Sequence, residues 1–230
     1  MLEVTRKGPA GWLRGFEGHE VMLRGPAGRI EGMYRPAKLR NAPVALVLHP
    51  NPERGGDMNN DVACVLYRVF AERGFSVLRF NFRGVGRSEG PSGDGELNDA
   101  SACLNWLYKE NIDPSDCYVA GHSFGAFIGM QLLMRRPEVS RFVALTPPAN
   151  LYDFSFLAPC PIPGLMVQGA QDILVPKEAV VRLANRLNLQ KSTDVTLKVI
   201  RGADHGFADH LEAVRKYMGA YVDKHTTMPA

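Results

Sequence analysis

Short apolar runs alternate with longer amphipathic stretches between residues 43 and 225. Such runs, bounded by Gly, Pro or Asn, are typical of strands that are buried on both faces of a parallel sheet. The runs predicted as strands are residues 44–48, 76–80, 118–120, 142–145, 165–167 and 196–200. Their alternation with helical stretches predicts an α/β fold around a mostly parallel sheet.

The stretches between these runs repeat their apolar side chains every three or four positions. In the last stretch the apolar positions are Leu211, Val214, Met218, Tyr221 and Val222. This spacing predicts helices with one buried face, and we interpret the apolar stripes as core rather than as ligand sites.

Two further runs precede the first parallel strand. Residues 20–23 and 29–34 flank a Gly-Pro-Ala-Gly turn at 25–28, which predicts an antiparallel hairpin at the edge of a mixed sheet. We expect one domain over residues 1–230, with a hairpin region at 1–36 and a strand-helix core at 43–225. The longest irregular stretch, residues 146–163, is too short for a second domain.

The composition is typical of a globular protein and excludes some classes of binding partner. Of the 230 residues, 45% are hydrophobic and 22% are charged, which argues against disorder, a collagen-like chain and a coiled coil. The net charge of +3 is scattered, so we expect neither a nucleic acid nor a membrane as partner. A homo-oligomer stays open.

Membrane insertion and secretion are not expected. Residues 117–134 and 154–171 lack Asp, Glu, Lys and Arg, but the first stretch contains polar side chains and three glycines, and the second contains three prolines. The first fifteen residues contain no apolar core of signal-peptide length, which predicts a cytoplasmic protein.

The four cysteines have no Cys-x-x-Cys spacing, so we interpret them as reduced thiols in or near the core: Cys64, Cys103, Cys117 and Cys160.

The main chemical signal is Gly-His-Ser-Phe-Gly at residues 121–125, which fits G-x-S-x-G. It directly follows a predicted strand and directly precedes a helical stretch, which is the context that a serine nucleophile on a sharp turn requires. The two glycines let strand and helix approach closely, and the helix directs its N-terminal N–H groups at the site. The alternative is a glycine-rich turn that only packs a strand against a helix.

A serine nucleophile needs a histidine base, and that histidine needs a carboxylate to fix its tautomer. Asp172 and His205 each follow a predicted strand, and the chain order of Ser123, Asp172 and His205 is that of a Ser-Asp-His triad. Asp204 and Asp153 are the alternatives for the acidic member.

At this point the chain resembles the α/β-hydrolase superfamily, and within it a small lidless bacterial group of predicted serine hydrolases. The resemblance runs from about residue 43 to the C-terminal helix. It also rests on His-Pro-Asn-Pro at 49–52 followed by two glycines, and on Arg-Phe-Asn-Phe-Arg-Gly-Val-Gly-Arg-Ser-Glu-Gly at 79–90. It implies about eight strands, helices on both faces and triad loops at the carboxyl ends of the strands. It further implies no cap domain, no metal and no cofactor, and a packing role for His49.

The oxyanion hole is expected to consist of backbone donors. One is the N–H of Phe124, which follows the nucleophile, and the other comes from the loop after the first parallel strand. Pro50 and Pro52 have no N–H, so Asn51 is the only donor between His49 and Glu53. The prolines alternatively serve only to stiffen the loop.

Substrate contacts are harder to assign. Tyr152, Phe154, Phe156 and Leu157 are candidates for an acyl pocket, or equally for core at the edge of the sheet. Two arginines follow the second parallel strand, Arg83 and Arg87. We interpret them as members of structural ion pairs or of a solvated loop, with recognition of an acidic substrate as the alternative.

The sequence therefore predicts a serine hydrolase that acts on small carboxylic esters or thioesters through an acyl-enzyme. A compact lidless site also resembles that of peptidase catalytic domains, so hydrolysis of peptides or aminoacyl amides is the enzymatic alternative. From a different class comes a catalytically silent hydrolase fold that binds a ligand or partner. The intact Ser, Asp and His set argues against the silent fold.

Overall fold

The fold is built on one sheet of eight strands, seen in a computed structural model that describes residues 9–190 and 193–228. The strand order is β1-β2-β4-β3-β5-β6-β7-β8, and every pair from β4 to β8 is parallel. The strands are β1 (His19–Gly25), β2 (Gly28–Arg35), β3 (Val44–Leu48), β4 (Ser76–Phe80), β5 (Cys117–His122), β6 (Arg141–Leu145), β7 (Gly164–Gly169) and β8 (Val195–Ile200). The predicted mostly parallel α/β sheet is confirmed.

The N-terminal hairpin is also confirmed and extends the sheet. β1 and β2 pair antiparallel about the turn in which Gly25 faces Gly28, and β2 pairs antiparallel with β4. The first eight residues of the predicted hairpin region, and of the segment used to assess a signal peptide, lie outside the described residues. One domain over residues 1–230 stays a prediction.

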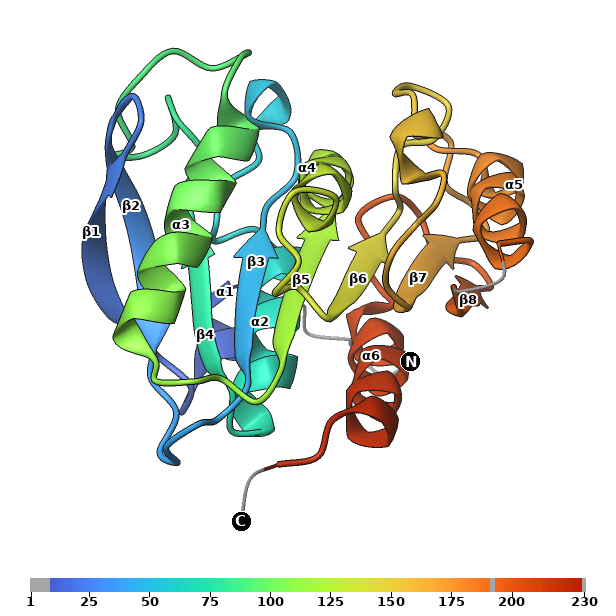
Figure 1. Cartoon of the computed structure of the whole chain (residues 1–230). Coiled ribbons are helices and arrows are strands. Elements are labelled where there is room, and N and C mark those ends of the chain that lie inside the picture. Colours follow the sequence, from blue (N-terminus) through green and yellow to red (C-terminus); the bar gives the residue numbers. More distant parts are fainter. Residues whose placement is uncertain (1–8, 191–192, 229–230) are drawn as a thin grey trace, which may run out of the picture.

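Helices cover both faces of the sheet because the central strands are apolar on both sides. On β3, Val44, Leu46 and Leu48 join one core cluster, while Ala45 and Val47 join the other. Side chains of α3 (Glu96–Glu110), α4 (Phe124–Leu133) and α5 (Lys177–Asn188) complete the first cluster. Those of α1 (Pro9–Leu13), α2 (Asp61–Glu72) and α6 (Leu211–His225) complete the second. Figure 1 shows α3 crossing in front of β3 and β4, with α2 behind them.

The four cysteines lie in this core as free thiols, as the sequence predicts. Burial raises the pKa of Cys64 to about 11, which leaves that thiol protonated at neutral pH. None of the helices formed by residues 9–190 and 193–228 has the length and hydropathy of a membrane span.

The connection between β6 and β7 consists of residues 146–163 and contains the short 3-10 helix η2 (Ser155–Leu157). No cap domain is inserted there, in agreement with the prediction. Because strands β3 to β8 run in one direction, the loops that follow them meet at the carboxyl edge of the sheet. The candidate site lies at this edge.

Candidate active site

Ser123 lies on a sharp turn between β5 and α4. Its backbone adopts φ 53° and ψ −115°, a conformation that is costly for a residue with a side chain. The turn is possible because its flanking glycines leave room for backbone. A Cβ on Gly121 would lie 2.3 Å from the carbonyl oxygen of Gly125, and a Cβ on Gly125 would lie 2.4 Å from that of Leu48. The strand–turn–helix context that the motif requires is therefore present.

The structure brings Ser123, His205 and Asp172 together from three loops. Nε2 of His205 lies 3.0 Å from Oγ of Ser123, and Nδ1 of His205 lies 2.8 Å from Oδ2 of Asp172. Asp172 follows β7 and His205 follows β8, so the carboxyl ends of neighbouring strands supply the two side chains. In this arrangement His205 can accept the proton of Ser123 while the carboxylate fixes its tautomer.

The carboxylate of Asp172 is buried, and both of its oxygens have partners. Oδ1 accepts hydrogen bonds of 2.9 Å from the backbone N–H groups of Leu174 and Val175, and Oδ2 accepts one of 3.1 Å from Nε2 of Gln168. Burial alone would raise the pKa of Asp172. The hydrogen bonds, above all the one from His205, outweigh burial and hold the pKa below its ordinary value.

The two alternative carboxylates lie in local turns. Oδ1 of Asp204 accepts a hydrogen bond from the N–H of Ala208, and Asp153 accepts two from Ser155. Neither residue contacts His205 through its carboxylate in the part of the chain that the structure describes. The geometry thus favours Asp172.

Two further histidines near the site are buried and neutral. His49 donates from Nδ1 to the carbonyl oxygen of Pro50 and accepts at Nε2 from the N–H of Phe82. His122 has Nε2 within 2.9 Å of the carbonyl oxygen of His205, to which it donates. Burial lowers the pKa of His49 to about 4 and that of His122 to about 3. Both side chains therefore stabilise the loops whose backbone groups they bind.

The backbone donors proposed for an oxyanion hole are unpaired. Among residues 9–190 and 193–228, no acceptor pairs with the N–H of Asn51 or of Phe124, although both residues line the pocket that contains Ser123. The Asn51 loop is held by its own hydrogen bonds, because its carbonyl oxygen accepts from Arg54 and Gly56 and its Oδ1 accepts from Glu53. A rigid loop presents a fixed donor.

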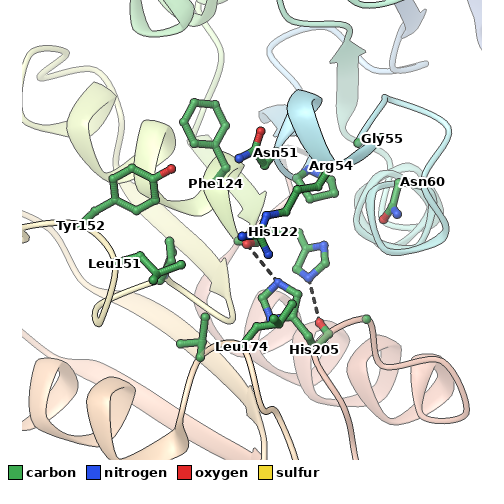
Figure 2. Close-up of a pocket in the computed structure, with 16 residues that line it drawn as sticks. Asn51, Arg54, Gly55, Asn60, His122, Phe124, Leu151, Tyr152, Leu174 and His205 are labelled. Carbon is green, nitrogen blue, oxygen red and sulfur yellow. Dashed lines mark hydrogen bonds between the residues drawn. The ribbon is translucent and has the colours of Figure 1, made fainter. Parts of the chain in front are cut away.

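The pocket beside these groups has a volume of about 310 Å³. In Figure 2, Asn51, Phe124 and Tyr152 lie in the upper part of the view and His205 lies below them. The full lining is Pro50, Asn51, Arg54, Gly55, Gly56, Asn60, His122, Ser123, Phe124, Pro148, Leu151, Tyr152, Leu174, Val175, His205 and Gly206.

Of the four residues suggested for an acyl pocket, only Tyr152 lines this cavity. Phe154 and Leu157 are buried in the core, and Phe156 packs against the same cluster. These rings are held by Phe127 of α4. Its ring stacks on that of Tyr152 at a centroid distance of 4.4 Å and makes T-shaped contacts with the rings of Phe154 and Phe156. The large apolar rings pack on the helix instead of facing Ser123.

The arginines after β4 form ion pairs, as we interpreted them. Arg83 contacts Asp99 at 2.7 Å in a nearly buried pair, and Arg87 contacts Glu31 and Glu20 at 2.8 Å each. Neither arginine lines the Ser123 pocket.

Other residues that were not predicted also line the pocket, notably Arg54, Asn60, Leu151 and Leu174. Of these residues, Arg54 could have been found from the sequence, because it lies in the same loop as the expected oxyanion donor Asn51. Gln168, which positions the Asp172 carboxylate, is the penultimate residue of β7 and gives no comparable signal.

Comparison with known proteins places this chain in a family. A model of the α/β hydrolase fold matches residues 46–159. The uncharacterised protein RP471 of Rickettsia prowazekii is 48% identical over 209 residues, which cover 88% of this chain and 88% of that protein.

Two crystal structures extend the similarity. A candidate α/β hydrolase of unknown function from Agrobacterium tumefaciens has a TM-score of 0.87 and 45% identity, covering 92% of this chain and 100% of that one. A serine hydrolase without a lid, XC6422 of Xanthomonas campestris, has a TM-score of 0.82 and 29% identity, covering 94% and 97%. With its eight-stranded sheet and this similarity over most of its length, the chain belongs to the α/β hydrolase family.

Proposed function

We propose that the protein is a serine hydrolase of small carboxylic esters or thioesters. The observation that carries this proposal is the continuous hydrogen-bonded chain from Ser123 through His205 to Asp172, with distances of 3.0 and 2.8 Å. A serine in this setting is activated because its proton has an acceptor within hydrogen-bond reach. The similarity to a lidless serine hydrolase supports the same chemistry.

The reaction would follow acyl transfer. Oγ of Ser123 attacks the substrate carbonyl while Nε2 of His205 takes its proton, and His205 then gives that proton to the leaving alcohol or thiol. Water attacks the resulting acyl-enzyme with His205 again as base, which releases the acid and restores the serine. Asp172 stabilises the imidazolium and holds its orientation throughout.

The developing oxyanion would be stabilised by the N–H groups of Phe124 and Asn51. Phe124 is the first residue of α4, so the positive end of the helix dipole adds to its N–H. Because neither donor has another partner among the described residues, neither must break a hydrogen bond to bind the oxyanion.

The size and lining of the pocket support a small acyl or alcohol group. Its volume of about 310 Å³ lies at the lower end for ligand sites. Leu151, Tyr152, Leu174 and Val175 provide an apolar wall. No cap formed by the described residues covers the site, which leaves it open to solvent and to substrates whose remaining parts extend outward.

Covalent labelling tests the activated serine. We expect a fluorophosphonate to add once to the native protein, on Ser123, as found by intact mass and peptide mapping, and not to the heat-denatured protein or to Ser123→Ala. Ser115→Ala is the matched control, because this exposed serine precedes β5 at the opposite edge of the sheet. A folded native protein that forms no adduct would contradict the proposal and favour a silent binding fold.

Substrate class is tested with a panel of short-chain esters, thioesters and aminoacyl amides. We expect kcat/KM to be highest for the esters or thioesters and Ser123→Ala to reduce turnover of each to the residual level. Faster hydrolysis of aminoacyl amides than of esters would instead identify a peptidase.

A further inference from the structure

The pocket of the candidate active site has an apolar half and a polar half. Figure 2 shows Leu151, Tyr152 and Leu174 together on one side of the pocket, and Arg54 and Asn60 on the other. The two halves come from different loops: the apolar residues follow β6 and β7, and the polar ones follow β3. A substrate that fills both halves must therefore have an apolar part and a polar part.

The polar half is positively charged. Arg54 is the only permanently charged residue among the described residues that line the pocket, and no Asp or Glu lines it. No carboxylate within residues 9–190 and 193–228 forms an ion pair with its guanidinium. In Figure 2 the side chain extends across the pocket toward His205. Arg54 is exposed, so this unpaired cation attracts an anion across a pocket that is open to solvent.

The loop holds the base of this cation in place. The N–H of Arg54 donates to the carbonyl oxygen of Asn51 at 3.1 Å, within the short 3-10 helix η1 (Pro52–Arg54). Asn60 adds a second donor: its Oδ1 accepts from the N–H of Val62 at 3.1 Å, which leaves its NH₂ group without a partner among the described residues. Two donor groups on one wall suit a ligand with several charged oxygens, which is a carboxylate or a phosphate.

The neighbouring cavity has the opposite charge. A space of about 150 Å³ shares Asn51, Phe124 and Tyr152 with the pocket and is also lined by Glu53 and Glu96. An anionic group would be repelled there and attracted to Arg54, so the charges on the two sides orient a substrate in one direction.

We propose that Arg54 determines specificity by binding a carboxylate or phosphate group of the ester substrate, while the apolar half holds the remaining part. This inference rests on the proposed ester hydrolysis. It differs from the acidic-substrate role considered for Arg83 and Arg87, because those two guanidinium groups are paired with carboxylates.

The test compares esters that differ in one charged group. On the alcohol side, 4-acetoxybenzoate and 4-acetoxyphenyl phosphate are compared with neutral 4-acetoxybenzamide. On the acyl side, mono-p-nitrophenyl adipate is compared with its methyl ester. For each pair the ratio of kcat/KM, charged over neutral, is measured in the native protein and in Arg54→Gln. Intrinsic reactivity cancels when the two proteins are compared.

We expect Arg54→Gln to reduce this ratio roughly tenfold for at least one charged ester, as the loss of one charge-assisted hydrogen-bonded pair predicts. Arg54→Lys should retain part of the preference, and added salt should weaken it. Arg40→Gln is the matched control: it removes the same charge from an exposed residue before β3, at the opposite edge of the sheet, and should leave every ratio unchanged. The response of the benzoate and phosphate esters shows which anion is preferred.

Ratios that are unaffected by Arg54→Gln, with the neutral esters still hydrolysed, would overturn the inference and leave the proposed function intact. If no ester is hydrolysed, the proposed function fails, and binding decides the inference. For that purpose 4-hydroxybenzoate and 4-hydroxybenzamide are titrated by NMR into Ser123→Ala with and without Arg54→Gln. Tighter benzoate binding that requires Arg54 supports the site, and equal binding of the two ligands overturns it.

Discussion

The two oxygens of Asp172 have separate tasks. Oδ1 is fixed by the backbone N–H groups of Leu174 and Val175, and Oδ2 faces Nδ1 of His205. The carboxylate therefore cannot rotate without losing backbone hydrogen bonds. Its orientation requires Nδ1 of His205 to carry the proton, which leaves Nε2 free to accept one from Ser123.

We predict that Asp172→Asn reduces kcat for an activated ester by about 10⁴-fold, the loss seen when a triad histidine is held in the wrong tautomer. The asparagine oxygen would keep the two backbone N–H donors, so its NH₂ group would face Nδ1 of His205. The imidazole would then carry its proton on Nε2 and could not accept the one on Ser123.

The control for this variant is Asp204→Asn, because Asp204 is adjacent to His205 in sequence but caps a local turn. We expect its kcat to remain close to that of the native protein. A larger loss in Asp204→Asn than in Asp172→Asn would transfer the orienting role to Asp204.

At the level of elements, the nucleophile turn depends on the contact between α4 and β3. The space for Gly125 is closed by backbone: a Cβ there would lie 2.4 Å from the carbonyl oxygens of both Leu48 and His49. Backbone atoms in a central strand cannot move aside, whereas the flexible end of a side chain can.

Gly125→Ala should therefore lower the free energy of unfolding by about 1–3 kcal/mol, as overpacking does, and displace Ser123 from His205. Denaturant unfolding and the rate of fluorophosphonate labelling measure the two effects. In the control Gly219→Ala, the three atoms nearest to the added Cβ in α6 belong to the guanidinium of Arg73, the flexible end of a side chain. We expect the control to change stability by less than about 1 kcal/mol; a similar loss in both variants would refute the role of the backbone contact.

For the molecule as a whole, buried neutral histidines make stability depend on pH. The folded-state pKa values of His49 and His122, about 4 and about 3, lie below the ordinary value of 6.5. Between pH 6.5 and about 4 the unfolded chain therefore binds protons that the folded protein does not bind at these positions. Stability contributed by the neutral histidines is complete above pH 6.5 and decreases as the pH falls through this window.

We predict that the free energy of unfolding falls by up to about 1.4 kcal/mol per pH unit for each of the two histidines as the pH decreases from 6.5 toward 4. Denaturant unfolding at several pH values measures the slope, and NMR titration of the imidazole protons assigns it to residues. A free energy of unfolding that is constant between pH 7 and 5, or an imidazole of His122 that titrates near its ordinary pKa, would contradict this prediction.

The strands of the sheet and the nucleophile turn are predictable from local sequence. Residues 44–48 and 76–80 were predicted as strands and form β3 and β4 with the same bounds. The turn at Ser123 could be predicted because its glycines and its flanking strand and helix are local features. Such features depend on steric limits and periodicity within a few neighbouring residues, so they can be deduced from a short window of sequence.

Which side chains face the pocket depends on contacts between residues that are distant in sequence. Tyr152 and Phe156 lie four residues apart and both contact Phe127 of α4, yet only Tyr152 lines the cavity. Arg54 remains unpaired among the described residues, whereas Arg87 pairs with Glu31, which is 56 positions away in sequence. The physical reason is that ion pairing and burial depend on partners that only the fold brings together.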